Sequence, residues 1–550
     1  MGHWLNYWQA LKVSAVRASV GLIKILKAWG VETIFALSGN QIMPIFDACL
    51  DEGIRVIHVR HEAAAVYMAE AHARITGGIG VAMVTAGAGL CNAIAPLFTS
   101  SQSQTPVLLL SGDSEANLDN MGSFQEMNQV QITCAVTKLS KRICQTSELE
   151  GAINTAITVA TTGTPGPVHL ALAADMLTNE LEDSPQIENQ VLSKNAESSE
   201  ASAGFLETLK SSQRPLIIAG PSLCMPHHVD VLHSLETRLG VPVVPMDSPR
   251  GLNDPRLGNF KAIARLADLI ILVGKPVDFS ISYGAVGPFD ADAKWFVFVG
   301  EERLVLQARR NLGDRLHDGV VMSPVEAIAM LTRLPTVSVD SNWHDSIRSA
   351  IACRDFSAFE TIRDVNELNS LSFSNALNDV LSLQDNVVAV SDGGEIGQWI
   401  QSVLTRYLVM INGVSGAIGG SLSYAMAIKQ VLPDKNVLAF MGDGTVGFHL
   451  AEFETAVREN LHVVAVIGND MQWNAEVKIQ ERDYGPDRVF ACGLSDARYD
   501  LVATALGGHG EFVTNLAEIG PALERALASG KPACINVRIH GFGAPTFANG

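Results

Sequence analysis

Two short turns, each at the end of an apolar run, carry residues suited to binding a charged ligand. Gly442, Asp443 and Gly444 form the first turn, and Asp470 belongs to the second. The glycines leave backbone N–H groups free to approach a diphosphate, and both aspartates can direct oxygens at one divalent cation. Because Mg²⁺ prefers near-octahedral oxygen ligands, the backbone carbonyl of Gln472 is a natural third ligand. The sequence therefore predicts a site at which Mg²⁺ bridges carboxylates and a diphosphate.

The segment that joins the two turns has the pattern of a helix. Leu450, Phe453, Ala456 and Val457 recur at helical spacing, and charged residues occupy positions between them. Gly-Asp-Gly is a common sequence, but its spacing from the second turn and the helix between the two turns make it indicative of a binding site. An ordinary strand-turn-helix unit without a ligand is the alternative interpretation.

A resemblance to a known family rests on two distant stretches. Residues 441–473, which begin MGDG and end NDMQW, resemble the diphosphate- and metal-binding motif of thiamine-diphosphate enzymes. Residues 33–89 resemble the pyrimidine-binding part of the same family, with VIHVRHEAAAVYMAEAHAR and VAMVTAGAGLCNA in the expected order. Within the family the likeness is to acetolactate synthase and benzaldehyde lyase types, and it extends over residues 16–538. The resemblance implies thiamine diphosphate and Mg²⁺ as cofactors.

The resemblance also implies residues that act on the cofactor and the substrate. In this family a carboxylate hydrogen-bonds the aminopyrimidine ring and helps the cofactor to lose its reactive proton, and Glu62 matches this position. Gln125 resembles a glutamine that contacts the bound substrate. The alternatives are a helix N-terminal acid for Glu62 and a surface amide for Gln125.

Gln41 departs from both types of relative. Benzaldehyde lyases have a catalytic histidine at this position, and acetolactate synthases have a small residue. An amide can orient a carbonyl or alkoxide by hydrogen bonding but is a poor proton shuttle. Gln41 is therefore a catalytic candidate as an orienting residue, and benzaldehyde lyase activity is not favoured.

Further cofactor contacts are implied position by position. Ile418 resembles the bulky apolar residue that wedges the cofactor into its bent form, although a lone isoleucine is otherwise a core residue. At Asp470 many relatives have asparagine, so the second carboxylate should make cofactor binding more dependent on the metal. The remaining implied contacts are Gly394, Glu395, Ile396, Gly416, Ala417, Gly442, Asp443, Gly444, Thr445 and Trp473.

The composition is typical of a large compact protein without polyanionic partners. The chain has 550 residues, of which 47% are hydrophobic and 18% charged, and its formal net charge is −19. This charge argues against nucleic-acid and anionic-membrane partners. Residues 75–112 contain no charged side chain, but prolines and a Ser/Gln cluster divide them into pieces too short to span a membrane. Eight cysteines without CxxC spacing indicate reduced thiols in a cytoplasmic protein.

Apolar strand-like runs alternate with helical patterns, which predicts an α/β protein of three doubly wound parallel-sheet domains. The resemblance makes residues 14–178 the pyrimidine-binding domain and residues 370–540 the diphosphate- and Mg-binding domain, with a central domain at 200–336. The polar segment 179–202 is expected to be a linker. FAD or ADP in the central domain is an alternative that is not favoured, because the usual Asp after the strand near Val299 is missing.

Three functions remain in view. The first is an acetolactate synthase-like carboligase that acts on a 2-oxo acid such as pyruvate. The second is a lyase that cleaves a 2-hydroxy ketone or a 2-hydroxyacyl-CoA. The third is a noncatalytic scaffold member of the family, which the retention of Glu62, Asp443 and Asp470 together argues against. The resemblance further implies a homodimer or homotetramer with the active site between protomers and a small carbonyl compound as substrate.

Overall fold

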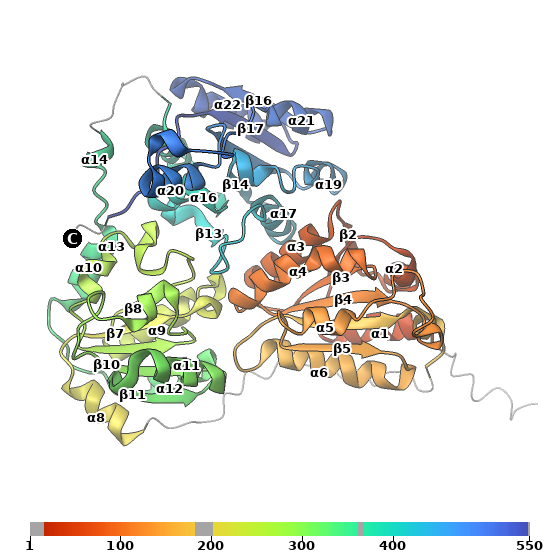
Figure 1. Ribbon diagram of the computed structural model, residues 1–550, viewed down its shortest axis with the longest axis horizontal. Coiled ribbons are helices and arrows are strands. Elements are labelled where there is room, and N and C mark those ends of the chain that lie inside the picture. The colour runs from red at the N-terminus through yellow and green to blue at the C-terminus, as the bar shows by residue number, and fades with distance from the viewer. Residues whose placement is uncertain (1–15, 182–201, 361–367, 548–550) are drawn as a thin grey trace, which may run out of the picture.

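Three parallel sheets follow one another along the chain (Figure 1). The computed structural model describes residues 16–181, 202–360 and 368–547. The inner strands read as nearly continuous apolar runs because helices cover both faces of each sheet. The predicted α/β fold of three doubly wound parallel-sheet domains is confirmed.

The N-terminal sheet has six strands, and its middle strands are fully buried. Their order is β2 (Arg55–His58), β1 (Thr33–Ala36), β3 (Gly80–Val84), β4 (Val107–Asp113), β6 (Val168–Ala173) and β5 (Leu139–Ile143). Its helices are α1 (Ala18–Ala28), α2 (Met43–Glu52), α3 (Glu62–Thr76), α4 (Ala88–Gln102), α5 (Gln129–Thr133), α6 (Leu149–Thr161) and α7 (Ala174–Thr178). The uncharged segment 75–112 thus forms β3, α4 and β4.

The central sheet has five strands. Their order is β11 (Leu316–Val321), β10 (Lys294–Val299), β9 (Leu269–Val273), β7 (Pro215–Ala219) and β8 (Val243–Pro245). The helices of this region are α8 (Ala203–Ser211), α9 (Val229–Leu239), α10 (Phe260–Ala264), α11 (Glu302–Leu312), α12 (Pro324–Arg333), α13 (Trp343–Ala352) and α14 (Ser357–Glu360).

The C-terminal sheet repeats the six-stranded plan of the first. Its order is β13 (Leu408–Ile411), β12 (Val387–Ser391), β14 (Asn436–Gly442), β15 (Val463–Asn469), β17 (Ala533–Arg538) and β16 (His509–Val513). Its helices are α15 (Ser370–Leu381), α16 (Gly394–Val403), α17 (Ser421–Val431), α18 (Asp443–Val446), α19 (Glu452–Arg458), α20 (Asn474–Tyr484), α21 (Tyr499–Ala505) and α22 (Ile519–Ala528).

The last strand of each six-stranded sheet lies inside the sheet rather than at its edge. β17 pairs with both β15 and β16, and β6 pairs with both β4 and β5. In the described part of the chain, β16 has no strand partner other than β17, and β5 has none other than β6.

The first and third sheets are joined through helices α3 and α17, which lie side by side in Figure 1. The Tyr424 hydroxyl on α17 donates to the Glu70 carboxylate on α3 at 3.2 Å. The backbone N–H of Arg60 donates to Glu452 Oε1 on α19 at 3.0 Å. One apolar core runs from the first sheet through these helices into the third, so the two regions share their packing.

The domain limits remain predictions. The three sheets occupy residues 33–173, 215–321 and 387–538, but the starts predicted at 14 and 200 and most of the linker at 179–202 lie outside the described residues. Within the described ranges, no helix has both the length and the apolar character needed to cross a membrane.

Candidate active site

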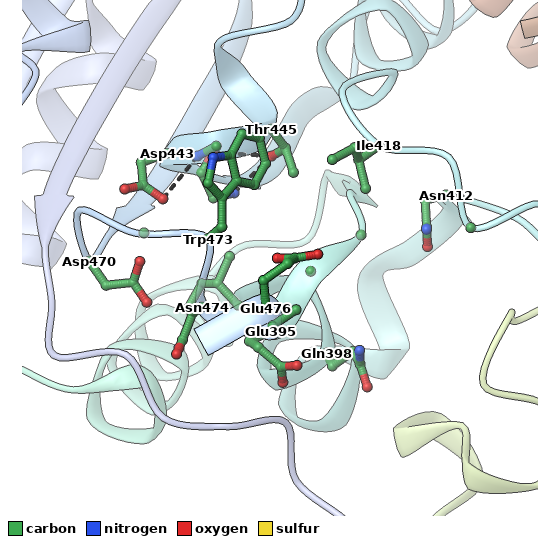
Figure 2. A pocket seen from close by; sticks show the side chains of 18 of the residues that line it. Glu395, Gln398, Asn412, Ile418, Asp443, Thr445, Asp470, Trp473, Asn474 and Glu476 are labelled. Atoms are coloured by element: carbon green, nitrogen blue, oxygen red, sulfur yellow. Dashed lines mark hydrogen bonds between the residues drawn. The ribbon is translucent and has the colours of Figure 1, made fainter. Parts of the chain in front are cut away.

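A cavity of about 410 Å³ opens at the carboxyl ends of β12, β14 and β15 (Figure 2). Ligands of open parallel sheets bind at this edge. The cavity brings together the predicted positions from four separate turns: Gly394, Glu395, Ile396, Gly416, Ile418, Gly442, Asp443, Gly444, Thr445, Asp470, Gln472 and Trp473 all line it. Ala417 does not line it, and its carbonyl instead accepts a hydrogen bond from Asn412 at 3.2 Å.

The two acidic turns are tied to each other. β14 and β15 pair with Gly442 opposite Gly468, so their carboxyl ends lie side by side. Asp443 Oδ1 accepts from the N–H of Gly444 at 2.9 Å, and Oδ2 accepts from the N–H of Gln472 at 3.2 Å. The Thr445 hydroxyl accepts from the N–H of Gly442 at 3.0 Å and closes the first turn. The second turn is therefore held against the first by the Asp443 side chain.

The two aspartates form a buried pair of acids. Burial raises the pKa of Asp443 to about 6. Burial, and then the negative charge of Asp443, raise the pKa of Asp470 to about 7. No group of three or more His, Cys, Asp and Glu side chains in the described ranges can hold a metal ion. A cation here would need the two carboxylates together with backbone oxygens.

Two glycines allow close packing at this corner of the cavity. A Cβ on Gly444 would lie 2.5 Å from Cζ3 of Trp473, so the indole ring packs directly over the Gly-Asp-Gly turn. A Cβ on Gly541 would lie 1.8 Å from Oδ2 of Asp470. The segment after β17 therefore passes against the second aspartate, a contact that the sequence did not reveal.

Asp392 is a buried anchor that sequence reasoning missed. Its carboxylate accepts hydrogen bonds from the N–H groups of Gly393 at 2.7 Å, Gly419 at 2.9 Å and Ser421 at 3.2 Å. Burial raises the pKa of Asp392 despite these donors. The carboxylate joins the turn before α16 to the turn that carries Ile418. An aspartate between an apolar run and two glycines was the available signal.

Ile418 packs against the neighbouring turn. A Cβ on Gly393 would come within 2.8 Å of Cγ2 of Ile418, so a glycine is needed at this contact. Other lining residues were not predicted as cofactor contacts: Ser248, Pro249 and Arg250 from the central region, together with Gln398, Gln401, Asn412, Gly468, Asn474, Ala475 and Glu476.

The three catalytic candidates gather in the N-terminal region. Glu62 begins α3, is buried, and accepts a hydrogen bond from Asn92 Nδ2 at 2.9 Å. Gln41 donates from Nε2 to Gln125 Oε1 at 3.0 Å. Thr85 donates to Gln41 Oε1 at 2.5 Å. Asn92 and Thr85 lie within the stretch VAMVTAGAGLCNA that carries the resemblance, but neither was predicted as a site residue.

Gln125 is held in an unusual conformation beside this cluster. Its φ is 61°, in the left-handed region that costs a residue with a side chain about 1–2 kcal/mol. A Cβ on Gly87 would lie 2.9 Å from the Cβ of Gln125, so these two segments of the chain approach each other closely. None of Glu62, Gln41 and Gln125 lines the 410 Å³ cavity. The chain therefore presents two separate groups of candidate site residues.

Comparison with known proteins shows which protein family has domains that match these two regions. The N-terminal TPP binding domain of thiamine pyrophosphate enzymes matches residues 16–132, and their C-terminal TPP binding domain matches residues 392–537. The chain belongs to the thiamine pyrophosphate enzyme family, which confirms the resemblance and the predicted class of enzyme.

Two kinds of relative match nearly the whole chain. The acetolactate synthase large subunit IlvG of Mycobacterium tuberculosis is 32% identical over 93% of this chain and 94% of its own length. The 2-hydroxyacyl-CoA lyase 2 of Homo sapiens is 28% identical over 96% of this chain and 91% of its own length. The bovine 2-hydroxyacyl-CoA lyase 2 is 29% identical over 94% of this chain and 89% of its own length.

Proposed function

We propose that this protein is a carboligase that uses thiamine diphosphate and Mg²⁺ to join a 2-oxo acid such as pyruvate to a second carbonyl compound. The convergence of Asp443, Asp470 and Ile418 on one cavity carries this proposal. The acetolactate synthase relative, 32% identical, supports the choice of a 2-oxo acid. The joint retention of these residues and Glu62 argues against a noncatalytic scaffold.

The residues present fit the diphosphate and the metal. Asp443 and Asp470 supply two carboxylate oxygens, and a divalent cation would offset the charge that their burial leaves uncompensated. The carbonyls of Met471 and Trp473 already accept from the N–H groups of Leu494 and Val477. The Gln472 carbonyl between them is the proposed third ligand. Gly442, Gly444 and Thr445 would leave room for the phosphate oxygens.

Thiamine diphosphate, when bound, supplies a nucleophilic carbon and an electron sink for bond cleavage at a carbonyl. Glu62 would exchange a proton with the aminopyrimidine ring. Asn92 already occupies Oε2 of Glu62, while Oε1 lies beside the bare backbone of Gly89. Oε1 is therefore the oxygen that we assign to this contact.

The two glutamines would orient the substrate. Gln41 uses its nitrogen on Gln125 and its oxygen on Thr85, so its amide is locked. Gln125 has its oxygen occupied by Gln41, which leaves its amide nitrogen to donate to a carbonyl oxygen. Neither amide is a proton shuttle, so their proposed role is to position the reacting carbonyl.

The active site is proposed to form between protomers of a homodimer or homotetramer. Within one chain the Glu62 group does not line the cavity that holds Asp443 and Ile418. A partner subunit that brings its own N-terminal group to the cavity would complete the site. The eight cysteines form no disulfide, which supports the proposed cytoplasmic location.

A lyase that acts on a 2-hydroxyacyl-CoA or a 2-hydroxy ketone is the second candidate. A cavity of about 550 Å³ lies between the N-terminal and central regions, and Lys138 and Arg303 line it. Two cations suit the phosphates of a nucleotide or of a coenzyme A thioester, although Asp278 and Glu301 also line the cavity and Arg303 pairs with Glu301. Because of this cavity, binding of ADP or FAD by the central region stays an alternative, although the missing Asp near Val299 argues against either cofactor.

Turnover of pyruvate tests the proposal. Protein loaded with thiamine diphosphate and Mg²⁺ is given pyruvate, alone and with an aldehyde, and the products are identified by mass spectrometry with Glu62→Ala as control. Acetolactate or a mixed acyloin, absent with Glu62→Ala, is the expected result. Cofactor binding without consumption of pyruvate would contradict it and favour the lyase.

A further inference from the structure

Arg250 stands out among the residues that line the 410 Å³ cavity. Four lining residues are acidic (Asp443, Asp470, Glu395 and Glu476), and Arg250 is the one lysine or arginine among the described lining residues. The two aspartates are accounted for by the proposed metal site. Glu395 has been given only as an implied cofactor contact, and the arginine and Glu476 have no role so far.

The guanidinium of Arg250 is free to bind a ligand. Its Nη2 lies 3.7 Å from Glu395 Oε1, farther than the roughly 2.8 Å of a charge-assisted hydrogen bond. The side chain is 44% exposed, and in the described chain its guanidinium donates no hydrogen bond to another residue. An arginine has two parallel N–H donors that match a carboxylate in geometry.

The backbone that presents Arg250 is fixed. Asp247, just before it, accepts from Arg74 Nη2 at 3.0 Å and from Arg256 Nη2 at 2.6 Å, in a buried network. The N–H of Arg250 donates to the Ser248 hydroxyl at 3.1 Å. Gly251 follows at φ 53°, and a Cβ there would meet the carbonyl oxygen of Ser280 at 1.8 Å. A fixed backbone limits the entropy lost when the side chain orders on a ligand.

The arginine lies next to the turn that supports the cofactor. The Cβ of Pro249 lies 3.9 Å from a Cβ built on Gly416, two residues before Ile418. Glu395, on the other side, is held by the N–H of Ala544. Arg250 is therefore the member of the pair whose side chain can move, and it can leave Glu395 to bind a ligand.

We propose that Arg250 binds the carboxylate of the acceptor, a second 2-oxo acid, in the proposed carboligation. This assignment rests on the proposed function. In the reaction the donor loses its carboxylate as CO₂, its carbonyl carbon bonds to the carbonyl carbon of the acceptor, and the acceptor oxygen takes up one proton. The acceptor keeps its own carboxylate throughout.

The fate of the two carboxylates decides between donor and acceptor. An ion pair with the donor's carboxylate would stabilise the ground state, because that charge leaves the carboxylate in the transition state, and would slow decarboxylation. An ion pair with the acceptor's carboxylate persists from substrate to product. It orients the acceptor without opposing the chemistry.

Competition between two acceptors tests the assignment. The loaded enzyme receives pyruvate, which serves as donor and as charged acceptor, together with acetaldehyde as neutral acceptor of similar size. The measured quantity is the ratio of acetolactate to acetoin. Arg250→Gln should shift this ratio toward acetoin by at least about tenfold, the loss typical of a hydrogen bond to a charged group. Arg250→Lys keeps the positive charge but lacks the two parallel N–H donors of the guanidinium, so it should shift the ratio less.

The outcomes separate this assignment from the proposed function. Both products at an unchanged ratio in Arg250→Gln overturn the role of Arg250 alone, whereas a wild-type enzyme that forms neither product overturns the carboligase proposal and this assignment with it. If Arg250→Gln does not fold, Glu395→Gln replaces it. That variant removes the competing carboxylate and should shift the ratio toward acetolactate, and no shift would overturn the assignment. Arg309→Gln, on the exposed face of α11, is the matched control and should keep the wild-type ratio.

Discussion

At the level of single residues, Asp470 places a second negative charge beside the proposed diphosphate site. Asp470→Asn keeps an oxygen ligand but removes that charge, so thiamine diphosphate should bind with a shallower dependence on Mg²⁺ concentration. Titration of the cofactor by calorimetry at several Mg²⁺ concentrations measures this dependence. A variant whose affinity falls as steeply as that of the wild type when Mg²⁺ is withdrawn would show that the charge of Asp470 is not what couples cofactor to metal.

Gly444 and Trp473 should behave as one unit. Gly444→Ala places a Cβ 2.5 Å from the indole ring, so the ring must move and cofactor affinity should fall by about tenfold or more. In a Trp473→Leu background the same change should cost much less, because contacting residues are not additive. Gly151→Ala on α6 is the control, since a Cβ there meets nothing within 4 Å. Equal losses in both backgrounds would contradict the coupling.

The site residues that could be predicted from the sequence belong to short motifs, in which adjacent residues contribute to the same site. The Gly-Asp-Gly turn and the Glu62 motif carry their own context, and the structure brings the predicted cofactor positions, except Ala417, to one cavity. Asp392 and Arg250 were missed because their importance depends on partners far along the chain. The carboxylate of Asp392 contacts Gly419 only once β12 has paired with β13, the strand that leads into the turn with Gly419.

At the level of elements, the strands were the predictable part. Residues 387–391 and 215–219 are apolar runs in the sequence, and they form β12 (Val387–Ser391) and β7 (Pro215–Ala219). The helix expected from Leu450 begins at Glu452, because the first turn after β14 is a separate short helix, α18. Periodicity marks long elements well, but it does not locate a helix of four residues that is fixed by one aspartate.

His169 on β6 should make stability depend on pH. Its ring is fully buried among the hydroxyls of Ser111, Thr133 and Ser140, and burial lowers its pKa from 6.5 to about 3. The unfolded chain takes up a proton that the folded chain refuses, so the contribution of His169 is complete above pH 6.5 and declines as the pH falls toward 3.

The melting temperature measured between pH 7.5 and pH 5 tests this effect, at values chosen around the ordinary histidine pKa of about 6.5. His169→Asn should melt lower at pH 7.5, because it loses ring contacts, but its melting temperature should fall less steeply on acidification. Parallel curves for the variant and the wild type would assign the acid sensitivity to other groups.

At the level of the whole molecule, the Glu62 group and the residues that line the cavity are separate within one chain. This separation predicts complementation between two inactive variants. Glu62→Ala and Asp443→Ala should each be inactive alone. Mixed in equal amounts and allowed to exchange subunits, they should recover about a quarter of wild-type activity, because half of the dimers are mixed and each holds one intact site. No recovery after exchange, confirmed by mass spectrometry of the mixed dimers, would place the site within one chain.

The strand order of the sheets also bears on how the chain is made. β16 ends at Val513 and is made before β17, which begins at Ala533, yet β17 is its one strand partner in the described chain. Until then β15, which leads to Asp470, has a bare edge, and bare edges invite pairing with other chains. The C-terminal sheet therefore stays incomplete until β17 has been made. Slow translation or a stalled ribosome near residue 530 would leave an aggregation-prone intermediate, which a chaperone would have to shield.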